Sequence, residues 1–329
     1  MEFDYKPLFS ITSEMLDLVV EITEHLTKLS PLNNLLKLPQ LRRINRLKTI
    51  HSSCAIEGNT LTLDQVSAVI EGKTVIAPKN EILEVKNAFE AYKLLEKINP
   101  YDMKDMLKIH SIMMDGLMDD SGKFRTKNVG VFDGDKPIHV APPPANVHSL
   151  VEMLFQWLKT DKINELIKAS IFHYEFEVIH PFNDGNGRLG RFMQTALLAK
   201  WKPIFTYIPV ESIIKDKQQE YYTAFRQCSA DNGSSNHFVT FMLKVILDAV
   251  RNIHNDTGNL IKSQTTQIQN LLEVMEHTPL SAKEIASRLN LKSIVGLKKN
   301  YLDPALKLGV IAMTLPDKPT SKNQKYYKP

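Results

Sequence analysis

The chain has few cysteines and no long apolar run. Cys54 and Cys228 are the only two cysteines among its 329 residues, too few for a disulfide framework or a cysteine metal cage, and they suit a reducing compartment. No apolar stretch approaches the ~18 residues of a membrane-spanning helix. The segment 1–10 also lacks the basic-then-apolar layout of a secretory signal. We therefore expect a soluble, cytoplasmic protein.

The composition is otherwise that of an ordinary globular chain. Its hydrophobic fraction of 43% and charged fraction of 24% exclude disordered and collagen-like classes, and its length suggests two or three domains. The charge is unevenly spread, however. From Leu260 to Pro329 there are 11 Lys and Arg against 5 Asp and Glu, while the rest of the chain holds 30 against 32. A basic C-terminal fifth indicates an acidic partner.

Apolar residues recur with the 3.6-residue period of helices through most of the chain, so the fold is predicted to be mainly α. One β signal interrupts this pattern, because Val129–Val140 reads as two short strands around a Gly-Asp turn. The segments with helical periodicity are 8–29, 38–56, 80–97, 102–115, 146–160, 162–179, 215–231 and 236–260. A capping box at Thr62–Gln65 opens a further helix with Val66, Val69 and Ile70, and the glycine-rich segment 180–191 opens another that runs to Lys200.

The C-terminal part changes character near residue 260. A capping box at Ser281–Glu284 opens one helix, a second is expected over 293–308, and short strands are expected over 310–314 and 324–327. Helix, turn, helix and hairpin is the element order of a winged helix-turn-helix. We expect an N-terminal helical region over 1–100, a core over 101–260 and a winged helix-turn-helix over 261–329.

The twelve residues His180–Arg191 carry the strongest chemical signal. The run Gly185–Gly187 bares backbone amides just before a helix, whose N-terminus favours an anion. Arg188 and Arg191 are three residues apart, so both can reach a polyphosphate from one helix face. Asp184 offers a hard oxygen ligand for Mg²⁺, and His180 can take a proton near neutral pH. This combination is typical of phosphoryl or nucleotidyl transfer.

The same segment resembles the motif of the Fic family, His-Pro-Phe-x-(Asp/Glu)-Gly-Asn-Gly-Arg-x-x-Arg, at every defined position. The resemblance extends over about residues 10–260 and implies a Fic-type helical core that transfers AMP from ATP to a Ser, Thr or Tyr hydroxyl of a target protein. It implies that His180 is the general base and that Asp184 coordinates Mg²⁺. It also implies that Asn186 and the amides of Gly185, Asn186 and Gly187 hold the phosphates.

The resemblance assigns further binding residues. Arg188 would bind the β-phosphate region, Arg191 would reach the γ-phosphate, and Tyr222 would lie near the adenine. The Val129–Val140 hairpin is similar to the family's flap, which would hold a target segment as an added strand. The alternative for the hairpin is that it only closes the fold, and for Tyr222 that it is only a core residue.

A second motif lies upstream. Ser53–Gly58 resembles the family's inhibitory motif, (Ser/Thr)-x-x-x-Glu-(Gly/Asn), in which Ser53 and Glu57 share a helix face and Gly58 ends the helix. By this resemblance Glu57 pairs with Arg191, occupies the arginine that the γ-phosphate needs, and inhibits the enzyme within its own chain. The alternative is a solvated helix end.

Several alternatives stay open at the level of sequence. Gly187 argues against the kinases of the superfamily, which have Lys there, whereas phosphocholine transfer and removal of AMP are not excluded. A DNA-binding regulator with a nucleotide-sensing Fic-like domain is the competing function, with Lys292, Lys298 and Lys299 on or beside the recognition helix. The basic module can equally contact protein, and a homodimer is one option for the oligomeric state.

Overall fold

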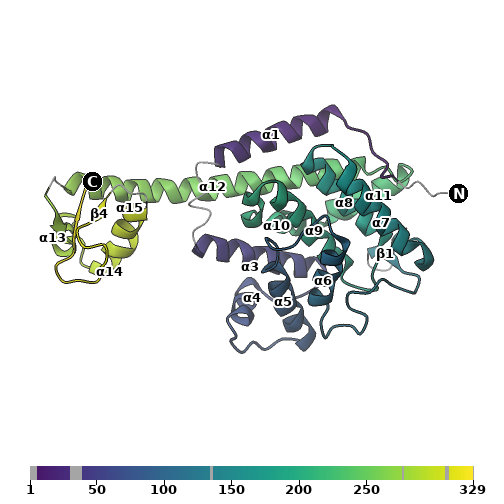
Figure 1. Ribbon diagram of the computed structural model, residues 1–329, viewed down its shortest axis with the longest axis horizontal. Coiled ribbons are helices and arrows are strands. Elements are labelled where there is room, and N and C mark those ends of the chain that lie inside the picture. Colours follow the sequence, from purple (N-terminus) through teal and green to yellow (C-terminus); the bar gives the residue numbers. More distant parts are fainter. Residues whose placement is uncertain (1–5, 30–38, 134–135, 276–277, 308–310, 329) are drawn as a thin grey trace. The chain divides into compact units, whose positions relative to one another are not determined.

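The computed structural model describes residues 6–29, 39–133, 136–275, 278–307 and 311–328. The chain divides into two compact units, Met1–Ile253 and His254–Pro329 (Figure 1). The prediction of a mainly α fold is confirmed in both units. The division expected at residue 100 falls within the first unit.

Helices α8 and α9 form the centre of the first unit. Almost every residue of both helices is buried, and Phe172, Phe176, Leu189 and Phe192 have no exposed surface. A helix that is buried on all sides lies inside a core rather than on a surface. The helices of this unit are α1 (Ser13–Leu29), α3 (Pro39–Ile56), α4 (Leu63–Ile70), α5 (Lys79–Tyr92), α6 (Met103–Met113), α7 (Pro144–Thr160), α8 (Glu165–Ile179), α9 (Asn186–Trp201), the 3-10 helix η2 (Pro203–Tyr207), α10 (Val210–Asp216), α11 (Gln218–Ala230) and the first part of α12 (Asn236–Val274).

Local sequence signals explain where several of these helices begin. The predicted capping box at Thr62 is present, because its hydroxyl accepts from the Gln65 amide and the Gln65 side chain accepts from the Thr62 amide. Asp102 accepts from the Lys104 amide before α6. Pro144 opens α7, where its missing N–H would have no helical partner.

The predicted hairpin is confirmed. Strands β1 (Gly130–Asp133) and β2 (Lys136–Val140) pair antiparallel, with Gly130 opposite Val140 and a register shift between Val131 and Phe132. The predicted turn at Gly134 and Asp135 lies outside the described residues.

The end of one helix was predicted wrongly, and one short helix was not predicted. Helix α12 continues to Val274 instead of ending near residue 260, because a single glycine at 258 costs only about 1 kcal/mol in a helix and the apolar period continues beyond it. Helix α10, which begins after Pro209, was not predicted, because seven residues are too few to show a clear period. None of the described helices is long and apolar enough to cross a membrane.

The second unit has its own small core. Ile268 and Leu271 from the end of α12, and Met275 directly after it, pack with Leu297, Leu302 and other buried residues of this unit. Its further elements are β3 (Leu280–Ser281), α13 (Ala282–Arg288), α14 (Ile294–Leu297), the π-helical turn η3 (Lys298–Leu302), α15 (Asp303–Lys307), β4 (Ala312–Met313) and β5 (Lys325–Tyr327). The strands form an antiparallel sheet in the order β3-β5-β4. The predicted helices and hairpin are present, whereas β3 was not predicted.

Candidate active site

The loop between α8 and α9 is shaped by two residues with positive φ. His180 ends α8 in the left-handed conformation, with φ of 48°, and Gly185 precedes α9 with φ of 81°. The positive φ favours glycine at 185, and a Cβ there would also lie 2.6 Å from Met114 Sδ and displace that side chain. The chain thereby turns sharply between two buried helices.

The Asn186 side chain holds this loop together. Its Oδ1 accepts from the Phe182 amide at 2.9 Å, and its Nδ2 donates to the Phe182 carbonyl at 2.8 Å. The His110 ring stacks on Phe182 with ring centroids 3.6 Å apart, and His110 Nε2 lies 2.9 Å from the Asp184 carbonyl. Burial lowers the pKa of His110, so a neutral imidazole supports the loop. In this structure the Asn186 side chain braces the loop, and its backbone amide lies at the start of α9.

His180 is close to a buried carboxyl. Its Nδ1 lies 3.3 Å from the Glu177 carbonyl and 3.8 Å from Glu177 Oε2. Burial, with a smaller contribution from the Glu57 carboxylate, raises the pKa of Glu177 to about 8, so this carboxyl holds a proton at neutral pH. Burial also lowers the pKa of His173 to about 3. The 3.9 Å approach of His173 Nε2 to Glu177 Oε1 is therefore a contact between neutral groups.

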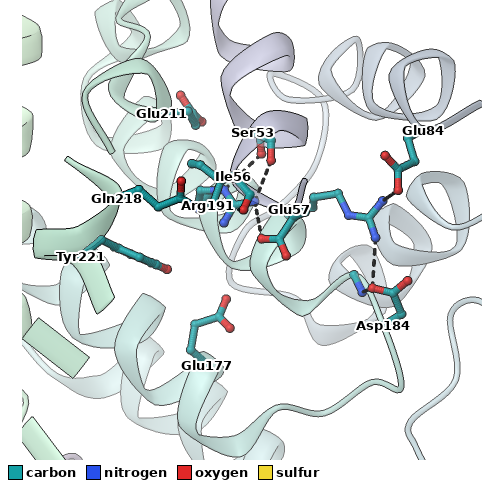
Figure 2. Close-up of polar contacts among 12 residues, drawn as sticks. Ser53, Ile56, Glu57, Glu84, Glu177, Asp184, Arg191, Glu211, Gln218 and Tyr221 are labelled. Atoms are coloured by element: carbon teal, nitrogen blue, oxygen red, sulfur yellow. Dashed lines mark hydrogen bonds and ion pairs between the residues drawn. The ribbon is translucent and has the colours of Figure 1, made fainter. Parts of the chain in front are cut away.

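Arg191 is held by the Ser53–Gly58 segment. Its guanidinium is 1% exposed and donates to Ser53 Oγ at 3.2 Å, to the Ser53 carbonyl at 2.9 Å and to Glu57 Oε1 at 2.8 Å (Figure 2). Burial of Arg191 lowers its pKa, but the Glu57 carboxylate more than compensates, so the net pKa is raised. The pair that the sequence predicts between Glu57 and Arg191 is present.

Glu57 also lies at the start of α9. A Cβ placed on Gly187 would collide with Glu57 Oε1, which puts this carboxylate oxygen beside the first turn of that helix. Amides in the first turn have no acceptor inside the helix and favour negative charge. Gly58, with φ of 92°, lets the chain turn away directly after Glu57. Glu57 therefore occupies both positive features that an anion would use here.

Arg188 is engaged by two other carboxylates. It donates from Nη1 to Glu84 Oε1 at 2.9 Å and from Nη2 to Asp184 Oδ1 at 3.1 Å (Figure 2). Its side chain is 7% exposed, and its Nε has no hydrogen-bond partner among the described residues. Asn59 donates to Glu84 Oε2 at 2.8 Å. Glu84 therefore connects Arg188 to the residue that follows the Ser53–Gly58 segment.

The two tyrosines of α11 have different surroundings. Tyr221 is buried, and its hydroxyl lies 3.2 Å from His173 Nε2. Tyr222 is partly buried, and its hydroxyl accepts from Gln218 Nε2 at 3.4 Å. The same Gln218 nitrogen lies 2.9 Å from the Ile56 carbonyl. Tyr222, rather than Tyr221, is thus the partly exposed ring, next to the end of α3.

Asp184 is suited to a magnesium ion that is shared with a substrate. Its side chain is 65% exposed, and its Oδ1 accepts from the Gly185 amide at 2.5 Å. Among the described residues no cluster of three or more His, Cys, Asp and Glu side chains could hold a metal alone. Mg²⁺ is often bound through one or two carboxylates together with substrate phosphates, and Asp184 fits that pattern.

Four residues of the site were missed from the sequence. Glu84 and His110 lie on helices far from the motif, and Glu177 is the third residue before His180. Each belongs to an otherwise ordinary helical pattern, so their contacts depend on tertiary packing. Arg125 was given no role in the site, although its side chain donates to the His180 carbonyl at 2.7 Å. A buried arginine beside Pro181 was not predictable from spacing.

The chain matches two sequence families. Residues 100–198 match the Fic/DOC family, and residues 266–327 match the C-terminal domain of Fic-like proteins described as filamentation induced by cAMP. A protein from Nematostella vectensis named protein adenylyltransferase Fic is 30% identical over 71% of this chain and 54% of its own length. Its namesake from Drosophila erecta is 33% identical over 59% of this chain and 39% of its own length. The chain therefore spans about half or less of these relatives.

Solved structures agree with the sequence match. A crystal structure of a Fic family protein from Desulfovibrio desulfuricans G20 has a TM-score of 0.74, 40% identity, and coverage of 99% of this chain and 98% of that one. Fic-1 from C. elegans has a TM-score of 0.57 over 75% of this chain and 72% of its own, and at 21% identity it supports the fold alone. On the near-complete match to the Desulfovibrio protein, this chain belongs to the Fic family.

Proposed function

We propose that this protein is a protein adenylyltransferase that moves AMP from Mg-ATP to a Ser, Thr or Tyr hydroxyl of a target protein. The observation that carries the proposal is the α8–α9 loop, which brings His180, the exposed Asp184, the start of α9 and two buried arginines together. The names of the curated relatives point to the same activity. We assign the catalytic core to residues 101–260, with the N-terminal region 1–100 supplying Glu57.

His180 is the proposed general base. Its Nδ1 faces the Glu177 carbonyl at 3.3 Å, which favours a proton on Nδ1 and leaves Nε2 as the nitrogen that accepts one. The target hydroxyl gives its proton to His180 while its oxygen bonds to the α-phosphorus of ATP. The bond from that phosphorus to the bridging oxygen breaks, and pyrophosphate leaves.

The phosphates would lie where negative charge is already favoured. The first-turn amides of α9 and Arg191 would hold the polyphosphate, and Nε of Arg188, which has no hydrogen-bond partner in the described part of the chain, adds a donor. Asp184 would hold the Mg²⁺, which neutralises phosphate charge when bound. Tyr222, partly exposed beside Gln218, is the proposed contact for the adenine.

Glu57 is the proposed inhibitor. It occupies Arg191 and the start of α9, which are the two features that the γ-phosphate of ATP would need. A nucleotide entering this site must compete with a carboxylate attached to the same chain. Inhibition of this kind is relieved when the carboxylate is removed.

Glu57→Gly is the test of activity and inhibition together. With labelled ATP and Mg²⁺, we expect this variant to label itself about 10- to 100-fold faster than wild type, corresponding to about 1.4–2.7 kcal/mol of lost competition. Intact mass should identify the adduct as AMP, and adding His180→Ala should abolish it. Glu71→Gly is the matched control, because Glu71 also follows a helix and precedes a left-handed glycine, Gly72.

Two outcomes would contradict the proposal. An adduct with the mass of one phosphate would indicate kinase chemistry. No adduct in any variant, with ATP binding retained, would favour a nucleotide-sensing role instead.

A second candidate concerns residues 261–329. We propose that this basic region contacts DNA, because Lys292, Lys298 and Lys299 are all exposed around α14 and η3 and lysines that neutralise phosphates give salt-dependent affinity. Duplex DNA should be retarded by the full chain at low salt and released as salt rises. Changing the three lysines to Gln should weaken retardation, whereas changing the exposed Lys86, Lys104 and Lys159 of the first unit should not. Equal retardation by both triple variants would contradict the assignment.

A further inference from the structure

Arg125 is a buried cation whose side chain binds only carbonyl oxygens among the described residues. It is 2% exposed. Its guanidinium donates to the carbonyls of His180 at 2.7 Å, Lys127 at 2.9 Å, Pro142 at 2.6 Å and Ile179 at 3.3 Å. A buried charge is costly unless hydrogen bonds satisfy it. Four carbonyls satisfy this one.

These carbonyls come from two functional segments. Ile179 and His180 end α8, where the last carbonyls have no helical donor and the helix end is negative. Lys127 and Pro142 flank the β1–β2 hairpin, one before its first strand and one after its second. The Arg125 amide adds a bond of 2.9 Å to the Pro181 carbonyl. One residue therefore binds both ends of the hairpin and the start of the catalytic loop.

We propose that Arg125 is a positioning residue that fixes the hairpin relative to His180. The inference rests on the proposed transfer activity, in which the hairpin holds the target and His180 takes the proton of its hydroxyl. If the hairpin moved relative to His180, the hydroxyl would lose its alignment with the base, and misplacement of about 1 Å can reduce a rate by about 100-fold. Arg125 touches neither reacting group through its own chemistry and acts through the backbone of His180.

Arg125→Lys is the informative change, because lysine keeps the charge but cannot reproduce the planar fork that reaches four carbonyls. Hydrogen exchange tests the connection without any need for activity. We expect protection to fall about fivefold or more at both 130–133 and 181–187 together, with α10 and α12 up to Ile253 unchanged. Arg43→Lys is the matched control, since the side chain of Arg43 is 54% exposed.

The rate tests positioning. In the Glu57→Gly background, Arg125→Lys should lower kcat for AMP transfer about 10- to 100-fold while KM for ATP changes less than about twofold. A role confined to overall stability would lower protection throughout the first unit and leave kcat of the folded enzyme unchanged, and either result overturns the proposal. So does a change in only one of the two segments. If Glu57→Gly alone transfers no label, the activity fails, while the exchange result still decides whether Arg125 connects hairpin and loop.

Discussion

The charge of Glu177 depends strongly on the groups that surround it. Groups that act on it come from four elements: His173 on α8 with His180 directly after it, Arg191 on α9, Tyr221 and Tyr222 on α11, and Glu57 after α3. Figure 2 shows Arg191, Tyr221 and Glu57 around Glu177. Its carboxyl is 7% exposed, and its Oε1 has no hydrogen-bond partner among the described residues. Its pKa of about 8 in the folded protein is well above the 4.5 of an unperturbed carboxyl.

This difference predicts how stability depends on pH. From about pH 4.5 upward the unfolded chain releases a proton that the folded chain keeps, so Glu177 weakens the fold progressively until its folded form also ionises near pH 8. Glu177→Gln should remove this loss and stabilise the protein by about 2–4 kcal/mol more at pH 9 than at pH 4. Urea unfolding at both pH values measures it. The exposed Glu24→Gln serves as control, and the same pH dependence in wild type and Glu177→Gln would contradict the prediction.

Among single residues, those near one another in sequence were the predictable ones. The spacing of Arg188 and Arg191 places them on one helix. The pairing of Glu57 with Arg191, which are far apart in sequence, followed instead from the resemblance of their two motifs to those of the Fic family. Glu84 and His110 gave no such signal, because a glutamate or histidine in a helical period is compatible with solvent, core or site. Only the packing of α5 and α6 near the loop determines that these two residues belong to the site.

At the scale of elements, helix α5 carries two glutamates in different surroundings, which allows a direct comparison. Glu84 binds buried Arg188 and Asn59, whereas Glu90 makes an exposed pair with Lys93. Glu84→Gln should cost about 1–3 kcal/mol of stability, because it leaves the buried guanidinium of Arg188 with the exposed Asp184 as its remaining carboxylate partner. Glu90→Gln should cost less than about 0.5 kcal/mol. Thermal unfolding compares them, and equal costs would mean that Glu84 contributes no more than a surface pair.

Two capped helix starts were predictable, whereas the end of α12 was not. The capping boxes at Thr62 and Ser281 lie where the sequence predicts them, because a cap is a local hydrogen-bond pattern. The end of α12 was missed by fourteen residues, from Leu260 to Val274. The continuation of α12 carries the apolar residues Ile268 and Leu271, which belong to the core of the second unit. Short elements such as α10 and β3 have too few residues to show a period.

At the scale of the whole molecule, the two units have separate apolar cores. Leu302 has no exposed surface in the second core, and Leu302→Ala should cost that unit about 2–5 kcal/mol. Hydrogen exchange should show faster exchange at 280–306, with protection in α8 and α9 unchanged. Leu315→Ala, at a partly exposed position of the same unit, is the control. Loss of protection in α8 and α9 would mean that the two units unfold together.

The left-handed backbone at His180 restricts which amino acids this position accepts. Apart from glycine, the residues that adopt such a conformation most readily are Asn, Asp and His. Of these, only histidine titrates between pH 5 and 8, so the turn and the proposed proton transfer favour the same residue. An inactive variant made with alanine changes backbone preference and chemistry at once. Asparagine tolerates the turn and lacks the imidazole, which makes His180→Asn the cleaner loss-of-base control.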